Sequence, residues 1–324
     1  MKNMKNILIT SAGKRVVLVE IFRKTLKDLR LSARVYTTDM RPDLAPACIK
    51  SDGSFKVPRC DSEGYVGRLL EICREFEVGI LIPTIDPELM PLSTNRRRFE
   101  ELGVSLVLPD ADFVRICRDK RLTMSFFEKK GIIVPYPIDK HHPSFPLFVK
   151  PYDKSRSVDA QVIWSEDELS KKLLDDPKML FMEYVGNDYK EFTVDMYFGR
   201  DGQVKGIVPR ERMEVRAGEI NKGITRKNYI VDFIKDRMGY LEGVRGCICV
   251  QLFYREADHD VKGIEINPRF GGGFPLSYYA RANFAEYIVR EYLMGEKIAY
   301  SEDWLDNTLM LRYDDEVIVY DAKA

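Results

Sequence analysis

The 324-residue chain has only three histidines and lacks the cysteine spacing of a metal or redox site. Its six cysteines form no CxxC pair and lie at no zinc-site spacing relative to the three histidines. Cys247 and Cys249 fall on one face of an apolar stretch, where we expect buried thiols that serve packing. His141, His142 and His259 lie in polar, loop-like surroundings that favour no catalytic role. The sequence therefore offers no Cys/His metal centre.

An excess of charge of either sign is also missing. Lysines plus arginines and aspartates plus glutamates both total 51, so no overall field attracts nucleic acid or an anionic membrane. No apolar run approaches the roughly 20 residues that span a bilayer, and residues 1–6 lack the pattern of a signal peptide. We expect a cytoplasmic protein with small-molecule partners, without nucleic-acid or membrane partners.

The first third of the chain alternates short apolar strands with helical patterns. We expect strands at about 7–10, 34–38, 79–83 and 104–107, separated by helices ending near Leu29 and spanning 63–77 and 87–102. This alternation predicts an α/β domain with a Rossmann-like parallel sheet.

The turn after the first strand lacks the full GxGxxG fingerprint of a dinucleotide site. It contains only Gly13, and Asp39 stands alone as a ribose-binding candidate, so a dehydrogenase is weakly supported. Asp86 and Glu88 follow the strand at 79–83, where open α/β sheets place ligands. Substrate contact and capping of the next helix are equally good interpretations of these two acids.

After Pro109 the pattern changes to helices at 112–118 and 119–130 and then mostly strands. We expect strands at 147–150, 159–164, 179–184, 190–198, 203–208, 245–254 and 260–267, and helices at 166–174, 228–241 and 275–294. This is an α+β arrangement on antiparallel sheets. The predicted domains are 1–109, 110–189 and 190–324.

The most informative stretch is the last of these strands. Because side chains alternate along a strand, Glu265, Asn267 and Arg269 share one face. The acid and the amide are ligands suited to Mg²⁺, and the guanidinium suits phosphate oxygens. Gln251, on the face of Cys247 and Cys249, needs a polar partner, which is either this metal or the backbone.

Other candidate residues are less specific on their own. Lys150 ends an apolar strand and can hold phosphate, and Lys120 opens a helix; a solvated lysine is the alternative for each. The extended segment at 181–186 can read an adenine edge through its backbone. Glu191 can bind ribose hydroxyls or can lie on an exposed sheet face.

Together these pieces resemble the ATP-grasp superfamily, above all its carboxylate–amine ligases and the synthetase domain of carbamoyl-phosphate synthase large subunits. The resemblance covers essentially the whole chain and implies an N-terminal preATP-grasp domain, helical linker, small lid domain and C-terminal ATP-grasp domain. Its most specific motif is Glu265-Ile266-Asn267-Pro268-Arg269, the family's E-x-N-x-R. It implies that Lys120 and Lys150 bind phosphate, that Glu183, Tyr184 and Val185 form the adenine hinge, and that Glu191 binds ribose. It also implies that Gln251, Glu265 and Asn267 are magnesium ligands and that Arg269 lies near the transferred phosphate.

Two positions depart from the family pattern. The lid segment at 151–157 contains no glycine, so it must close over phosphate through Lys154, Ser155 and Arg156 or not close fully. Gln251 stands where many relatives have glutamate, which removes one anionic ligand and weakens metal binding.

The resemblance implies ATP-dependent activation of a carboxylate as an acyl phosphate, with Mg²⁺ or alternatively Mn²⁺. An amine or other nucleophile then attacks, and ADP and phosphate leave. Arg210 and Arg212 share a strand face and can hold an anionic substrate, unless they belong to a solvated turn paired with Glu211 and Glu214. The glycines at 271–273 leave room for substrate or form a plain turn. A nucleotide-binding protein without ligase activity is the alternative function, and a homodimer is expected only because dimers are common.

Overall fold

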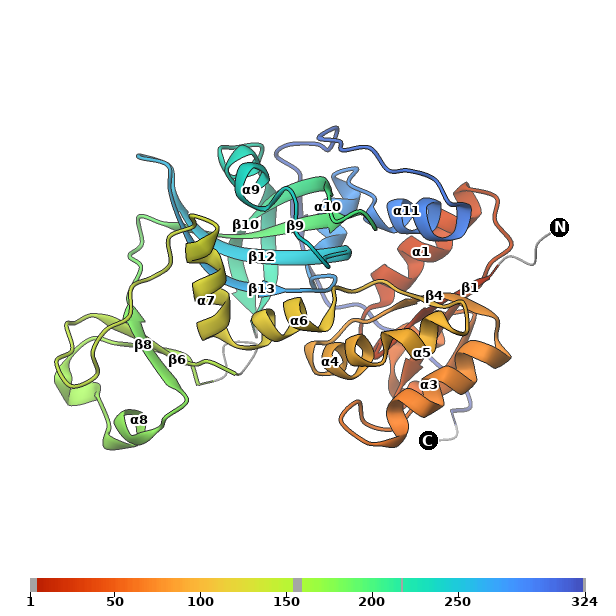
Figure 1. Ribbon diagram of the computed structural model, residues 1–324, viewed down its shortest axis with the longest axis horizontal. Coiled ribbons are helices and arrows are strands. Elements are labelled where there is room, and N and C mark those ends of the chain that lie inside the picture. Colours follow the sequence, from red (N-terminus) through yellow and green to blue (C-terminus); the bar gives the residue numbers. More distant parts are fainter. Residues whose placement is uncertain (1–4, 154–158, 217, 323–324) are drawn as a thin grey trace.

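The computed structural model describes residues 5–153, 159–216 and 218–322 and contains three sheets (Figure 1). A five-stranded parallel sheet has the order β3-β2-β1-β4-β5, and a six-stranded antiparallel sheet has the order β13-β12-β9-β10-β11-β14. The third sheet, β7-β6-β8, is antiparallel. The predicted fold class, a Rossmann-like parallel domain followed by antiparallel ATP-grasp sheets, is confirmed.

The parallel sheet and its helices form the N-terminal domain. Its strands are β1 (Asn6–Ile9), β2 (Val35–Asp39), β3 (Gly53–Lys56), β4 (Val78–Ile82) and β5 (Ser105–Leu106). Its helices are α1 (Val16–Asp28), η1 (Pro42–Leu44), α2 (Pro46–Ile49), α3 (Gly64–Glu75), α4 (Asp86–Thr94) and α5 (Arg96–Glu100). β1 and β4 are neighbours, so the loops that follow them meet at one edge of the sheet.

Two linker helices lead to the small sheet. They are α6 (Ala111–Arg118) and α7 (Lys120–Lys129), and the small domain contains β6 (Leu147–Pro151), β7 (Gln161–Ile163), η2 (Glu166–Glu168), α8 (Lys171–Asp175) and β8 (Met179–Glu183). This domain has a hydrophobic cluster of its own, built on Leu147, Val149 and Phe181. Figure 1 shows it at the opposite end of the molecule from the N-terminal domain.

The large sheet carries the rest of the chain. Its strands are β9 (Lys190–Phe198), β10 (Val204–Arg216), β11 (Glu219–Thr225), β12 (Gly246–Arg255), β13 (Asp260–Asn267) and β14 (Leu309–Leu311). The helices are α9 (Ile230–Met238), α10 (Phe274–Tyr279), α11 (Phe284–Val289) and the π-helical segment η3 (Arg290–Met294). One continuous core contains Ile7 and Ile9 of β1 together with Val194 and Val250 of this sheet, so the large sheet and the N-terminal domain pack as one body.

Several expected boundaries were wrong. The strand expected at 203–208 continues to Arg216 and pairs with β11. The sequence did not indicate this hairpin, because its charged and partly exposed residues lack the apolar pattern of a buried strand. The helix expected at 275–294 is interrupted between α10 and α11, and the one expected at 87–102 breaks at Asn95. The domain boundaries remain a prediction.

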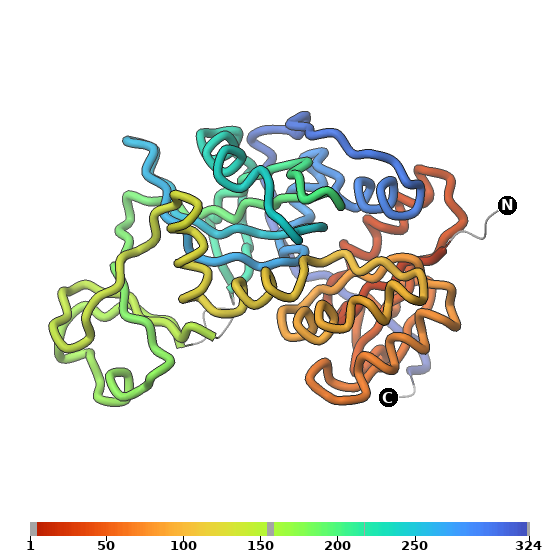
Figure 2. The backbone as a smooth tube through the Cα atoms, viewed as in Figure 1, coloured from red at the N-terminus to blue at the C-terminus, as the bar shows by residue number. Residues whose placement is uncertain are grey.

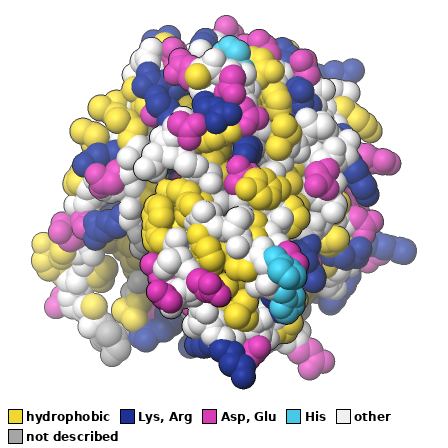
Figure 3. Space-filling model, turned by 90° about the vertical axis from the view of Figure 1, so that its left-hand side faces the viewer, with side chains coloured by type: hydrophobic (Ala, Val, Ile, Leu, Met, Phe, Trp, Pro, Cys, Tyr) yellow, Lys and Arg dark blue, Asp and Glu magenta, His cyan; other side chains and the backbone are white. Residues whose placement is uncertain are grey.

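The chain ends and the surface add two observations. In Figure 2 the last residues run from the large sheet past the N-terminal domain, so both termini lie toward that end of the molecule. Figure 3 shows acidic and basic side chains interspersed over the opposite end. Among the described helices, none combines the length and apolar character needed to cross a membrane.

Candidate active site

A cleft of about 680 Å³ lies where the three sheets meet. One wall comes from the small domain and α7, the floor comes from the large sheet, and the far end comes from the loops after β1 and β4. All described residues of the predicted site line this cleft: Lys120, Lys150, Glu183, Tyr184, Val185, Glu191, Arg210, Arg212, Gln251, Glu265, Asn267 and Arg269. Ser155, together with Lys154 and Arg156 of the lid segment, lies outside the described residues.

The predicted metal ligands are neighbours on two paired strands. Gln251 of β12 is in register with Glu265 of β13, and Asn267 follows on the same face. The Asn267 amide donates to Oε1 of Glu265 over 3.0 Å. The Gln251 amide donates to the same oxygen over 3.2 Å when its oxygen accepts from Arg212. Rotation about its terminal bond lets either amide present its oxygen, in place of its nitrogen, to a cation bound beside Glu265. The three side chains therefore suit a hard cation that prefers oxygen ligands.

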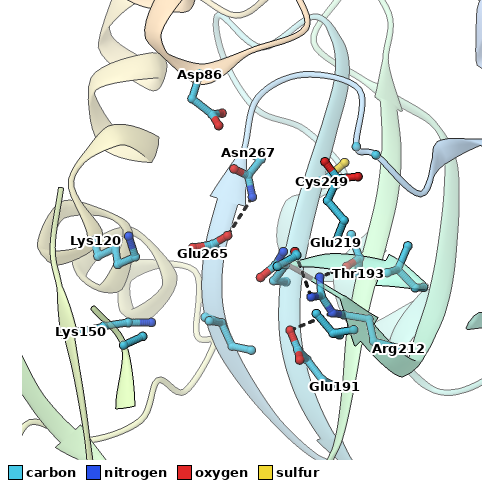
Figure 4. Close-up of a pocket in the computed structure, with 18 of the residues that line it drawn as sticks. Asp86, Lys120, Lys150, Glu191, Thr193, Arg212, Glu219, Cys249, Glu265 and Asn267 are labelled. Carbon is cyan, nitrogen blue, oxygen red and sulfur yellow. Dashed lines mark hydrogen bonds and ion pairs between the residues drawn. The ribbon is translucent and has the colours of Figure 1, made fainter. Parts of the chain in front are cut away.

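Two lysines face these ligands across the cleft (Figure 4). Lys120 opens α7, and Lys150 lies in β6; only 8% and 9% of their surfaces are exposed. Burial lowers the pKa of Lys150 to about 8, against the opposing effect of the Glu265 carboxylate. Burial likewise lowers the pKa of Lys120. Two poorly hydrated ammonium groups opposite an acid favour a polyanion between them.

The adenine and ribose candidates lie at the small-domain end. Glu183 pairs with Lys262 of β13, and the ring of Tyr184 packs against Trp164 with ring centres 5.3 Å apart. Glu191 pairs with Nε of Arg212 over 3.1 Å, and burial raises the pKa of this carboxyl group. The hinge segment thus lines the cleft and is tied to the large sheet through the Glu183–Lys262 ion pair.

The two arginines of β10 have different surroundings. Arg210 is 1% exposed and donates to both oxygens of Asp195 over 2.8 Å each. Arg212 pairs with Glu191 and reaches Gln251. The alternative of a solvated turn is therefore wrong, because both arginines lie on a strand and pair within the cleft. The bidentate pair favours a structural role for Arg210, and contact with substrate stays a prediction for both arginines.

The N-terminal domain contributes residues that sequence reasoning left open or missed. Asp86 accepts a 2.7 Å bond from Nη2 of Arg269, whereas Glu88 is fully buried and accepts from the backbone amides of Thr84 and Ile85. One acid thus faces the cleft and the other caps α4. Arg15 also reaches the cleft, with a 3.5 Å bond to the Thr84 carbonyl. Only tertiary structure brings these loops to the E-x-N-x-R strand.

The glycine run after β13 serves two purposes. A Cβ on Gly273 would lie 2.2 Å from Nη1 of Arg210, and one on Gly271 would lie 2.8 Å from Sγ of Cys249. These two glycines let the loop pack against buried side chains. Gly272 instead faces charged tips in the cleft: its Cβ would lie 3.0 Å from Oε2 of Glu219 and 3.2 Å from Nη1 of Arg15.

Comparisons with known proteins agree with this arrangement. Residues 7–107 match the family described as the PylC-like N-terminal domain, and residues 175–310 match that described as ATP-grasp in the biosynthetic pathway with Ter operon. A stretch of 79 residues, 24% of this chain, is 43% identical to the 3-methyl-D-ornithine–L-lysine ligase of Methanosarcina acetivorans. That stretch spans only 20% of the length of the curated relative.

Solved structures resemble almost the whole chain. The biotin carboxylase domain of Hydrogenobacter thermophilus 2-oxoglutarate carboxylase superimposes with a TM-score of 0.72 at 15% identity, over 95% of this chain and 74% of that one. N5-carboxyaminoimidazole synthetase from Staphylococcus aureus gives a TM-score of 0.68 at 15% identity, over 91% of this chain and 78% of that one. L-amino acid ligase from Bacillus licheniformis gives a TM-score of 0.65 at 18% identity, over 90% of this chain and 75% of that one. At these identities the likeness is one of fold.

The fold, the cleft and the two family matches define an ATP-grasp protein, and the resemblance seen in the sequence is confirmed. More narrowly, residues 7–107 are similar to the PylC-like N-terminal domain and residues 175–310 to the ATP-grasp family of the biosynthetic pathway with Ter operon.

Proposed function

We propose that this protein is an ATP-dependent ligase that activates a carboxylate for attack by an amine or another nucleophile. The observation that carries the proposal is the placement of Lys120 and Lys150 opposite Glu265 and Asn267 in one cleft (Figure 4). Arg269 lines the same cleft. Cations on one wall and oxygen ligands on the other suit a nucleotide triphosphate with its metal. Two of the similar proteins are ligases and a third is a synthetase, which supports the same chemistry.

In this proposal each side chain has a defined task. Glu265 and Asn267, with Gln251, would hold Mg²⁺ or Mn²⁺, which when bound neutralises charge on the phosphates. Lys120 and Lys150 would hold the phosphate oxygens, and Glu191 and the backbone of 183–185 would hold the nucleoside. Among the described residues, no three His, Cys, Asp or Glu side chains are grouped so that they could hold a metal ion by themselves, which is compatible with a site that shares its ion with phosphate oxygens and water.

The chemical sequence has two steps. A carboxylate oxygen of the acid attacks the γ-phosphorus, the bond to the β–γ bridging oxygen breaks, and ADP forms. The nucleophile then attacks the acyl carbon, phosphate leaves with the bonding pair, and an amine nucleophile gives up one proton to solvent or a nearby base. Arg269 stabilises negative charge on the transferring phosphoryl group, and positioning supplies much of the rate.

The test is acid-stimulated ADP release. Purified protein with Mg·ATP is given a panel of carboxylates with and without amines, and products are identified by mass. A ligase releases ADP and phosphate only when an acid is present and forms a product lighter than its two substrates by one water. Glu265→Gln is the inactive control.

Two outcomes would point to the other interpretations. Tight Mg·ATP binding with no stimulation by any acid would favour a nucleotide-binding protein without ligase activity. Stabilisation by NAD but not by Mg·ATP in a thermal-shift series would favour a dehydrogenase. Sedimentation at several concentrations tests the proposed homodimer.

A further inference from the structure

The end of the cleft farthest from the small domain contains two opposite charges from different domains. Arg15 comes from the loop after β1, and Glu219 comes from the first position of β11. Both approach Gly272, so they border the same methylene-sized space. Both residues are described by the structure, yet no ion pair joins them. The space beside Gly272 is therefore bordered by one positive and one negative side chain that a ligand can contact.

The Arg15 guanidinium is poorly satisfied by the protein. Its one hydrogen bond to a described residue, to the Thr84 carbonyl, is long at 3.5 Å. Burial and then the nearby charge of Arg269 lower the pKa of Arg15 to about 10. Arg269 already pairs with Asp86, whereas no ion pair joins Arg15 to a described residue, so its partly desolvated guanidinium favours an anion beside it. Since Arg269 and the proposed metal ligands line the same cleft as Arg15, an anion bound by Arg15 would lie near the transferred phosphate.

The Glu219 carboxylate is instead held in its charged form. Burial opposes ionisation, but the hydrogen bond from Arg312 (3.1 Å) and the charges of Arg15 and Lys14 bring its pKa below the usual range. Lys14 is 68% exposed and lies 3.4 Å from Oε2. Figure 4 shows Glu219 reaching from the hairpin toward the loop that follows β13. A fixed carboxylate at this point suits an ammonium group.

We propose that the acid substrate is an α-amino acid, whose carboxylate lies beside Arg15 and whose ammonium group lies against Glu219. The inference rests on the proposed ligase function and narrows its substrate class. In an α-amino acid the two charged groups are separated by a single carbon, which matches two opposite charges converging on one glycine. In this proposal position 272 is a glycine because the α-carbon of the substrate occupies the space that a Cβ would fill.

The discriminating experiment compares an amino acid with its analogue that lacks the amino group. Binding is measured by calorimetry with Mg²⁺ and a non-hydrolysable ATP analogue, using α-amino acids and the corresponding simple carboxylates. We expect wild type to bind at least one amino acid tenfold or more tightly than its des-amino partner. Glu219→Gln should reduce that ratio to about one, and Gly272→Ala should weaken both ligands, while each variant keeps its affinity for the nucleotide.

Glu214→Gln is the matched control, because Glu214 lies on the same hairpin but its exposed carboxylate binds Asn221 and Lys222 outside the cleft. It should bind as wild type does. Equal affinity of wild type for amino acids and des-amino analogues would overturn the inference, as would an unchanged ratio in Glu219→Gln. A loss confined to thermal stability would show that Glu219 only ties the hairpin to Arg312. Amino-acid binding without ADP release would instead overturn the proposed ligase function alone.

Discussion

The carboxylate of Asp86 and the guanidinium of Arg269 form a 2.7 Å ion pair that connects the N-terminal domain to the E-x-N-x-R strand. Both side chains are largely buried, with 12% and 15% of their surfaces exposed. Asp86 opens α4, whose loop is fixed by the capping carboxylate of Glu88. The arginine nearest the proposed phosphoryl transfer is thus oriented by a side chain of the N-terminal domain.

Replacing Asp86 with asparagine tests this orientation. The amide keeps the shape but leaves the buried Arg269 charge uncompensated, so we expect a destabilisation of about 3 kcal/mol and a kcat lowered roughly tenfold or more. The affinity for Mg·ATP should change little, since Lys120 and Lys150 are untouched. Urea unfolding, steady-state ADP release and nucleotide calorimetry measure the three quantities.

Asp112→Asn is the control for that change, because Asp112 pairs with Arg115 on the surface with 88% of its side chain exposed. It should leave stability, kcat and ATP affinity unchanged. An Asp86→Asn variant with normal kcat would show that Arg269 needs no orientation from the N-terminal domain.

Lys150 gives the site a defined pH dependence. Its pKa is lowered to about 8, so its ammonium is charged below that pH and neutral above it. Affinity for Mg·ATP should therefore fall as pH rises from about 7.5 to 9.5, and ATP binding near pH 8.5 should take up a proton because the phosphates stabilise the charged form. Calorimetry in buffers of different ionisation enthalpy detects that uptake.

Lys150→Gln should bind Mg·ATP more weakly at neutral pH and lose most of the proton uptake. Lys172→Gln, a change of an exposed lysine in α8 of the same domain, should retain both the affinity and the uptake. If the wild-type affinity were flat from pH 7 to 9.5, Lys150 would not contact the phosphates.

The metal ligands predict opposite effects for two exchanges on neighbouring strands. Glu265→Gln removes the carboxylate that both amides contact, so we expect a kcat lowered about 100-fold or more and a higher Mg²⁺ requirement. Gln251→Glu adds an anionic ligand in register with Glu265 and should lower the Mg²⁺ concentration for half-maximal activity severalfold. Mg²⁺ and Mn²⁺ titrations of ADP release measure both; equal metal requirements in the two variants would contradict the assignment.

Local patterns in the sequence were sufficient for one side of the cleft and not for the other. Glu265, Asn267 and Arg269 share a face because strand side chains alternate, and Gln251 was recognisable as an amide on an apolar strand. Arg15 and Glu219 are 204 positions apart, in a loop and a hairpin that the sequence did not predict to meet. Their convergence depends on the packing of β1 and α1 against the large sheet, which no local period encodes.

The same limit explains the interpretation of β10. Its charged residues from Arg210 to Arg216 resemble a solvated turn, because the acid that accepts from Arg210 lies on β9 and the hairpin partner β11 has little apolar pattern. Strand alternation correctly placed Arg210 and Arg212 on one face. Their partners became visible only when the register of β9 and β10 was known.

Arg210 and Asp195 provide the last prediction, because they separate a structural from a substrate-binding role. Asp195 also accepts from Ser277 over 2.6 Å and from the Cys249 thiol over 3.1 Å, so its carboxylate is surrounded by donors in a buried network. Arg210→Ala should destabilise the protein by about 3–5 kcal/mol by leaving that charge unpaired. The Arg210→Ala/Asp195→Ala double variant should be less destabilised than the sum of the two single changes. Kinetics of the folded Arg210→Ala protein decide the role. A KM for the acid within about threefold of wild type supports the structural role, since a threefold change in KM corresponds to less than about 1 kcal/mol of binding free energy. A KM raised tenfold or more with unchanged unfolding would assign Arg210 to the substrate.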